Sequence, residues 1–96
     1  MTNTQKSITL LDNGCCVDTV FLNLVRDAVK RRLPSLIRRK KYTLKDICSD
    51  EFWKELEDDG PRRSAGWCMA YLISRQEVPL MDAGKNSSNS KVYQLV

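Results

Sequence analysis

The sequence predicts a mostly α-helical fold that ends in a C-terminal β-hairpin. Two observations support this prediction. Apolar residues recur at i, i+3, i+4 and i+7 along several segments, as in amphipathic helices, and two short apolar runs flank a polar loop near the C-terminus. The chain has 96 residues, which is enough for one small domain. We therefore predict an N-terminal arm or short strand over residues 1–16 and one folded domain over residues 17–96.

The first predicted helix runs from Val17 to Leu33, after a turn over residues 12–14. Asp18 falls in its first turn and three cations fall in its last turn, which suits the helix dipole at both ends. Pro34 disfavours helical geometry at the residue before it and ends the helix. The apolar residues of this helix form more than one stripe: Val17, Val20, Phe21, Leu24, Val25, Ala28, Val29 and Leu33.

Two short helices are predicted next. Thr43, with Asp46 three residues later, is a variant of the capping box and predicts a helix that begins at Leu44. Ser49 or Asp50 then caps a second short helix. The residues that these two helices are expected to bury are Leu44, Ile47, Cys48, Phe52, Trp53 and Leu56.

The third long segment is predicted to be a helix from about Pro61 to Gln76. Its buried face is expected to consist of Ala65, Cys68, Met69, Leu72, Ile73 and Gln76. Its other face carries cations, two aromatic rings and small residues, unlike an ordinary solvated face: Arg62, Arg63, Gly66, Trp67, Ala70, Tyr71, Ser74 and Arg75. Two interpretations of this second face remain open: it binds a partner, or Trp67 and Tyr71 pack as core under the basic segment.

The C-terminal hairpin is predicted from the apolar runs at 78–83 and 91–96 and the polar loop at 84–90. This loop supplies hydrogen-bond donors and no negative charge, which is compatible with contact to a sugar-phosphate backbone.

Charge is unevenly distributed along the chain, although the net charge is only +4. Nine basic residues and one acid lie between Arg26 and Lys45, whereas seven acids and one lysine lie between Asp46 and Asp59. Such a basic block favours a polyanionic partner, nucleic acid above all. The alternative is that the basic and acidic blocks face each other or are simply solvated.

The composition argues against an enzyme. The chain has no histidine, which removes the commonest general acid/base and the commonest metal ligand. Glu51 and Glu55 share a helix face, but acidic helix faces are usually solvated, so we expect no metal and no cofactor. No apolar run is long enough to span a membrane, and the start of the chain does not resemble a signal peptide. We therefore expect a cytoplasmic protein with no membrane partner.

The four cysteines do not show the paired spacing of a zinc site. Cys48 and Cys68 lie on the apolar sides of their segments, where a free thiol behaves as a small hydrophobe. Reduced structural thiols are the expectation, with a disulfide or a metal site as the alternatives.

The order of the predicted elements resembles that of the winged helix-turn-helix superfamily. This order is a helix, a short extended piece, two further helices and a two-stranded hairpin. The stretch 65–73, which continues into residues 78–80 and closes at 93–95, is similar to its recognition helix and wing. The chain also resembles small regulators and accessory proteins of prophages. The resemblance covers roughly residues 17–96 and rests on the order of elements.

The resemblance implies a base-reading role for residues of the third helix: Arg62, Arg63, Ser64, Trp67 and Tyr71. It implies a wing role for residues 85–89, among them Lys85, Asn86 and Ser87. Further cations are expected to contact nucleic acid from the helix end and from the basic segment: Arg75, Arg38, Arg39, Lys40 and Lys41.

The sequence thus predicts a protein that binds double-stranded DNA, either a transcriptional regulator or an accessory factor in DNA recombination. The alternative is an adaptor or inhibitor that uses the same fold to engage a protein, with aromatic residues as anchors. The several apolar stripes of the first helix also predict a homodimer, unless residues 1–14 cover the second stripe within one chain.

Overall fold

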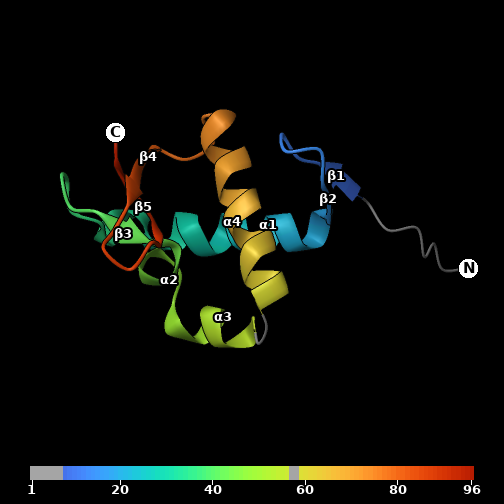
Figure 1. Ribbon diagram of the computed structural model, residues 1–96, viewed down its shortest axis with the longest axis horizontal. Helices are drawn as coiled ribbons and strands as arrows, with labels where there is room; N and C mark the ends of the chain where they lie inside the picture. Colours follow the sequence, from blue (N-terminus) through green and yellow to red (C-terminus); the bar gives the residue numbers. More distant parts are fainter. Residues whose placement is uncertain (1–7, 57–58) are drawn as a thin grey trace, which may run out of the picture.

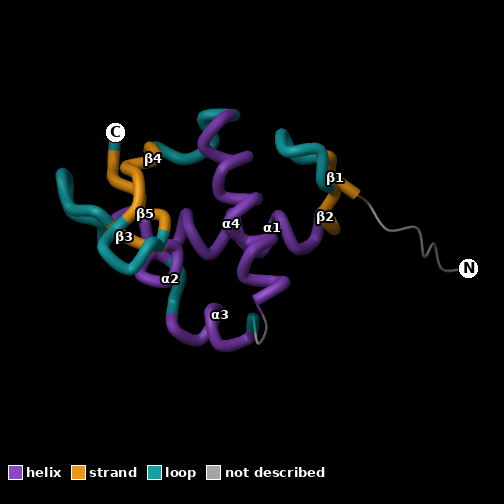
Figure 2. Tube along the Cα trace, in the orientation of Figure 1, coloured by secondary structure: helices purple, strands orange, loops and turns teal. Residues whose placement is uncertain are grey.

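The computed structural model describes residues 8–56 and 59–96, in which two small antiparallel sheets lie at opposite ends of a group of four helices (Figures 1 and 2). In chain order the elements are β1 (Ile8–Leu10), β2 (Cys16–Asp18), α1 (Thr19–Arg32), the 3-10 turn η1 (Leu33–Ser35), β3 (Tyr42–Thr43), α2 (Leu44–Ile47), α3 (Asp50–Glu55), α4 (Asp59–Ser74), β4 (Leu80–Lys85) and β5 (Lys91–Leu95). Helix α4 crosses in front of α1, and the core lies where the helices meet the larger sheet (Figure 1).

The first helix begins two residues later than predicted. Val17 belongs to β2 and pairs with Thr9 of β1, and the two strands are joined by a turn in which the Leu11 N–H donates to the Cys15 carbonyl at 2.8 Å. Gly14 takes φ +84° in this turn, as the predicted turn over residues 12–14 requires. Asp18 is the N-cap of α1, because its side chain accepts the N–H of Val20 at 2.9 Å.

The buried stripe of α1 also differs from the prediction. Leu22, Val25 and Val29 are buried, whereas Val20 is 64% and Leu24 51% exposed. The helix packs against α4, and this contact selects the side of α1 that carries Leu22. The apolar spacing of α1 allowed more than one stripe, so only the position of α4 decides which of them is core.

The two short helices begin where the capping signals predict. Thr43 caps α2 by accepting the Asp46 N–H at 3.1 Å, and the Asp46 carboxylate accepts the Thr43 N–H at 3.1 Å. Ser49 is the cap of α3 and accepts the Phe52 N–H at 3.1 Å. The side chains of Leu44, Ile47, Cys48 and Leu56 are buried, and those of Phe52 and Trp53 are half-buried against the same core.

Helix α4 buries the predicted face, apart from its last two members. Ala65, Cys68, Met69 and Leu72 are fully buried, and Ile73 is half-buried against the same core. Gln76 is exposed instead, because the helix ends at Ser74 and Gln76 takes the left-handed conformation, φ 58°. Its N–H donates to the Ile73 carbonyl at 3.0 Å, and the next N–H donates to the Leu72 carbonyl at 2.9 Å. This is the Schellman ending of a helix, here with glutamine where glycine is usual.

The sequence predicted a separate two-stranded hairpin at the C-terminus, and the structure does not show one. The C-terminal strands belong to a three-stranded antiparallel sheet with the order β3-β5-β4. Tyr42 pairs with Tyr93 and Thr43 with Val92, so the segment that precedes α2 is tied to the last strand of the chain. A long-range pairing of only two residues leaves little trace in the local sequence pattern.

All four cysteines are free thiols, and Cys48 and Cys68 are buried as predicted. Burial raises the pKa of Cys48 to about 12 and that of Cys68 to about 11. Both thiols therefore remain protonated at neutral pH and fill space in the core. Because the thiolate is the reactive form of cysteine, these two thiols are unreactive at this pH.

Candidate nucleic-acid interface

A groove of about 600 Å³ lies between the first half of α4, the start of α2 and the β4–β5 loop, residues 86–90. Helix α4 supplies one wall with Arg62, Arg63, Gly66, Trp67 and Ala70. The start of α2 and the β4–β5 loop supply the facing walls with Thr43, Leu44, Lys45, Asn86, Ser88, Ser90 and Lys91. Three segments that are distant in the sequence therefore share one concave surface.

The charged side chains that line the groove, among the residues that the structure describes, are all cations. They are Lys45, Arg62, Arg63 and Lys91, and none of the described lining residues carries a carboxylate. The ion pairs formed by the described residues are Arg26–Glu77, Arg75–Asp12 and Lys91–Asp82, so Lys45 and Arg63 take part in none of them. A cleft lined by one sign of charge concentrates the opposite charge. The groove is therefore suited to an anionic ligand.

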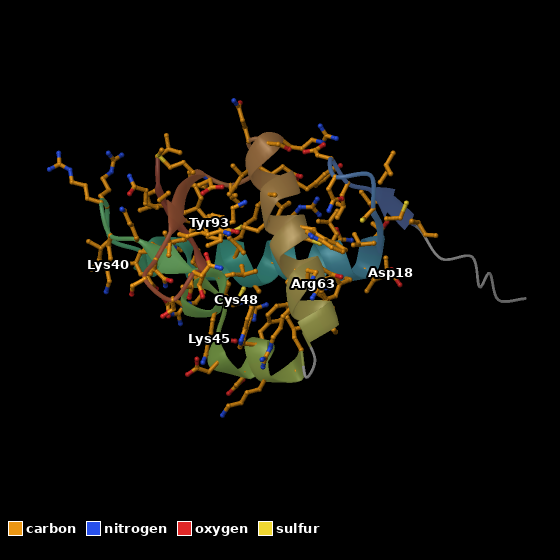
Figure 3. The ribbon with its side chains drawn as sticks, in the orientation of Figure 1. Asp18, Lys40, Lys45, Cys48, Arg63 and Tyr93 are labelled. Atoms are coloured by element: carbon orange, nitrogen blue, oxygen red, sulfur yellow. The ribbon has the colours of Figure 1, made fainter. Side chains whose placement is uncertain are left out.

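Lys45 and Arg63 occupy different walls of this groove and lie on the same side of the molecule (Figure 3). Both side chains are exposed. Lys45 follows the capping residue Thr43 by two positions, so the cap of α2 sets its position. Arg63 lies in the second turn of α4, in front of Gly66 and Trp67.

Arg62 lines the groove and also contacts Trp53 within the fold. Its guanidinium lies over the Trp53 ring, 5.1 Å from the ring centre, and its Nη2 donates to the Trp53 carbonyl at 3.3 Å. These contacts tie the start of α4 to the end of α3. The Arg62 Nε is buried and has no hydrogen-bond partner among the described residues, so one donor of this side chain is left over at the groove wall.

The loop at 86–90 is held in shape by one side chain. The Asn86 amide oxygen accepts the N–H of Ser88 at 2.9 Å and that of Ser90 at 3.0 Å, while Asn89 takes φ 64°. The sequence predicted Asn86 as a contact to a partner, and the structure shows its oxygen already used within the loop. Asn86 still lines the groove, together with Ser88 and Ser90.

Three of the predicted α4 contacts do not line the groove. Ser64 lies in a separate recess beside Phe21 and Pro61. Arg75 lies over the Tyr71 ring, 4.5 Å from its centre, and forms an ion pair with Asp12 at 3.5 Å. The C-terminal end of the predicted binding face therefore contacts the turn between β1 and β2 through Asp12.

The basic segment Arg38–Lys41 is also outside the groove. Its four side chains are exposed on the loop before β3, and Arg39 takes φ 70° in the turn. Lys40 lies over the Tyr42 ring, 5.3 Å from its centre, and the loop projects beyond the sheet, away from α4 (Figure 3). Of the predicted wing residues, Lys85 and Ser87 are exposed and lie beside the groove residues Asn86 and Ser88.

Sequence reasoning missed Lys45 and Lys91 as groove residues. Lys45 lies at the end of the basic block, and the only sequence signal that distinguishes it from the other cations is its position next to a helix cap. Lys91 opens β5 opposite Lys85, and its Nζ is 3.1 Å from the Asp82 carboxylate. The backbone N–H of Gly84 and the charge of Lys91 lower the pKa of Asp82, so this pair is ionised at neutral pH.

Asp50 lies beside the groove on the side of α3, in a small recess that it lines together with Trp53 and three cations, Lys45, Lys54 and Arg62. Part of the acidic block, residues 57 and 58, lies outside the described residues.

None of the described helices combines the length and apolar character needed to cross a membrane. Within residues 8–56 and 59–96, no cluster of three or more metal-ligating side chains is found. Comparisons with known proteins found no family model, no curated protein and no solved structure that matches the chain.

Proposed function

We propose that the protein binds double-stranded DNA through the groove between α4 and the β4–β5 loop. The observation that carries this proposal is the single-sign charge of a concave surface built from three separate segments. Nucleic-acid backbones are polyanions, and the cations that contact them are the main source of affinity. A regulator of transcription or an accessory factor in recombination acts in this way.

We further propose that the chain is a winged helix-turn-helix protein. The order of elements supports this: α1, the short strand β3, the helices α2 to α4 and then the β4–β5 pair. In this assignment α4 is the recognition helix and the β4–β5 loop is the wing. Both line the same groove, so one duplex can contact them together.

The groove residues differ in the chemistry that they offer to DNA. Lys45 and Lys91 are point charges suited to phosphate, and Lys91 would contact a phosphate in place of its ion pair with Asp82. Arg63 carries a planar fork that can bond two acceptors of a guanine edge. The hydroxyls of Ser88 and Ser90 can donate to phosphate oxygens. We therefore expect α4 to contact the bases, and the facing walls to position the duplex by contacting its phosphates.

The test is a titration of labelled duplex DNA with the parent protein and two arginine variants. Affinity of the parent should fall by orders of magnitude between about 50 and 200 mM salt. Arg63→Gln should weaken binding about tenfold. Arg75→Gln is the matched control, because Arg75 is an exposed arginine of the same helix face that is paired with Asp12 away from the groove. It should leave affinity unchanged.

Two results would contradict the proposal. One is binding that does not respond to salt or that is absent at low salt. The other is an equal loss of affinity with Arg63→Gln and Arg75→Gln, because that result would mean that the groove is not the contact surface.

A second candidate function is protein binding, either as an adaptor or inhibitor or through a homodimer. It is favoured by the apolar residues left exposed on β1 and at the start of α1. Ile8, Leu10, Val20 and Leu24 are all more than half exposed. Sedimentation at micromolar concentration, with and without duplex, tests the homodimer: association that Leu24→Ser weakens supports it, and a monomer under both conditions contradicts it.

A further inference from the structure

Gly66 is placed in the middle of α4, where glycine is the least favourable residue except proline. A Cβ atom added to Gly66 would meet no other atom within 4 Å among the described residues. Alanine would therefore fit at this position and would favour the helix.

The fold itself does not require glycine here. Glycine is needed where φ is positive or where another part of the chain comes close to the backbone. Gly66 has no positive φ, and the space at its Cβ position is open. The packed face of α4 lies elsewhere, at Ala65 and Met69, both of which are fully buried.

The open space at Gly66 belongs to the groove. Ala70, one turn further on, is exposed on the same wall, and Trp67 lines the wall between these two small residues. Arg63 precedes Gly66 on α4, and Lys45 and Lys91 line the facing walls. A ligand that lies against Gly66 is therefore close to cations on both sides.

We propose that one sugar-phosphate strand of a DNA duplex lies against Gly66 and Ala70 on the α4 wall of the groove. This inference rests on the proposed function and adds to it the point of closest approach between helix and backbone. The missing side chain lets the strand come deep enough for phosphates to meet Lys45 and Lys91, and for Arg63 to reach past the strand to a base. Charge-assisted hydrogen bonds of this kind need donor–acceptor distances below about 3 Å, so even a small outward shift of the strand weakens them.

The experiment compares the variants Gly66→Ala and Gly66→Leu with the parent protein in two measurements, thermal unfolding and titration of a labelled duplex of random sequence. Gly66→Ala should unfold at a temperature about 4 °C higher than the parent, because alanine favours the helix. It should nevertheless bind duplex about tenfold more weakly. Gly66→Leu should bind more weakly still, because its side chain fills more of the groove.

Gly60→Ala is the matched control. Gly60 lies in the first turn of the same helix, has equally open space at its Cβ position and does not line the groove. This variant should bind duplex as tightly as the parent.

Opposite changes in stability and affinity separate this inference from a purely structural role for Gly66. If Gly66→Ala is stabler and binds duplex as tightly as the parent, the inference is wrong, while the proposed function stands. If Gly66→Ala unfolds more easily than the parent, Gly66 serves the fold and the inference is again wrong. If the parent binds no duplex at low salt, the proposed function itself fails, and the inference fails with it.

Discussion

The two halves of α4 present similar residues to very different surroundings. In the first half, Arg63 and Trp67 line the groove. One and two turns further on, the Tyr71 ring lies under Arg75, and Arg75 forms an ion pair with Asp12 in the turn between β1 and β2. Each half carries an arginine and an aromatic ring on the predicted binding face. Only in the first half do both the arginine and the aromatic ring line the groove.

This contrast shows what a periodic pattern can and cannot assign. The 3.6-residue period identifies which side chains share a face, because it depends only on the geometry of the helix. Whether a face remains open depends on segments that arrive from elsewhere. Here Asp12 is 62 and 63 residues away from its partners Ser74 and Arg75, and the Ser74 hydroxyl donates to its carboxylate at 2.5 Å.

The largest expected effect concerns two buried thiols, that of Cys68 on the interior face of α4 and that of Cys48 at the end of α2. The pKa of Cys48 is raised to about 12 and that of Cys68 to about 11, from 9.0, so the unfolded chain loses these protons at lower pH than the folded chain. Stability should be fully present below pH 9 and should fall as the pH rises toward 11, by on the order of 3 kcal/mol. Denaturant titrations across this range measure the fall, and the variant with Cys48→Ala and Cys68→Ala should show a smaller one. A fall of the same size in that variant would assign the effect to other groups.

Two exposed cations of the groove, Lys45 and Arg63, form no ion pair with the described residues, and their removal should weaken duplex binding without affecting the fold. The double variant Lys45→Gln, Arg63→Gln should bind duplex more weakly by about 2 kcal/mol, because it removes two cationic groups that bind phosphate or a base. Its unfolding temperature should stay close to that of the parent, since both side chains are exposed and outside the ion pairs of the described residues. Duplex titration and thermal unfolding measure the two quantities. A large drop in stability with unchanged binding would reverse the assignment.

Two aromatic substitutions one turn apart should both lower stability and should differ in their effect on duplex affinity. Tyr71→Ala should lower the free energy of unfolding by about 1–1.5 kcal/mol, because the half-buried ring packs on the core and holds Arg75. It should leave the affinity for duplex unchanged. Trp67→Ala, the matched variant, should weaken duplex binding as well as stability, because Trp67 lines the groove. Equally reduced affinity in the two variants would mean that the contact surface extends along the whole helix.

The smallest expected effect concerns the basic loop, which tests whether the contact surface extends beyond the groove. Replacing Arg38, Arg39, Lys40 and Lys41 with glutamine should weaken binding at low salt only a few-fold. The dependence of affinity on salt should become less steep, by about 0.9 for each phosphate that the loop no longer neutralises. Relative affinities for different duplex sequences should not change, because phosphate contacts carry no base information. An unaltered salt dependence would place the loop outside the contact surface.

Local patterns in the sequence predicted much of the helical structure. The capping box at Thr43, the cap at Ser49 and the buried face around Cys68 and Met69 are present as predicted. Each of these features depends on residues within about one or two helical turns, so a window of sequence contains its physical cause. The same holds for the turn at Gly14.

The candidate site was only half predicted, because it is assembled from distant segments. Arg62, Arg63 and Trp67 were identified from the unusual face of their helix, and they do line one wall. Lys45 and Lys91 were not identified as groove residues. They share the groove because β3 pairs with β5, which sets the start of α2 beside the β4–β5 loop.

By itself, the sequence of this protein determined where α2 and α3 begin and which face of α4 is buried. Caps and apolar spacing act over a few residues, and their energies do not depend on the rest of the fold. Only the tertiary structure decided that Val17 belongs to a strand, that α1 buries Leu22 and exposes Leu24, and that the two halves of α4 have different neighbours. Those outcomes depend on contacts between segments far apart in the chain. The packing of the whole molecule selects one such set of contacts among several that the local pattern allows.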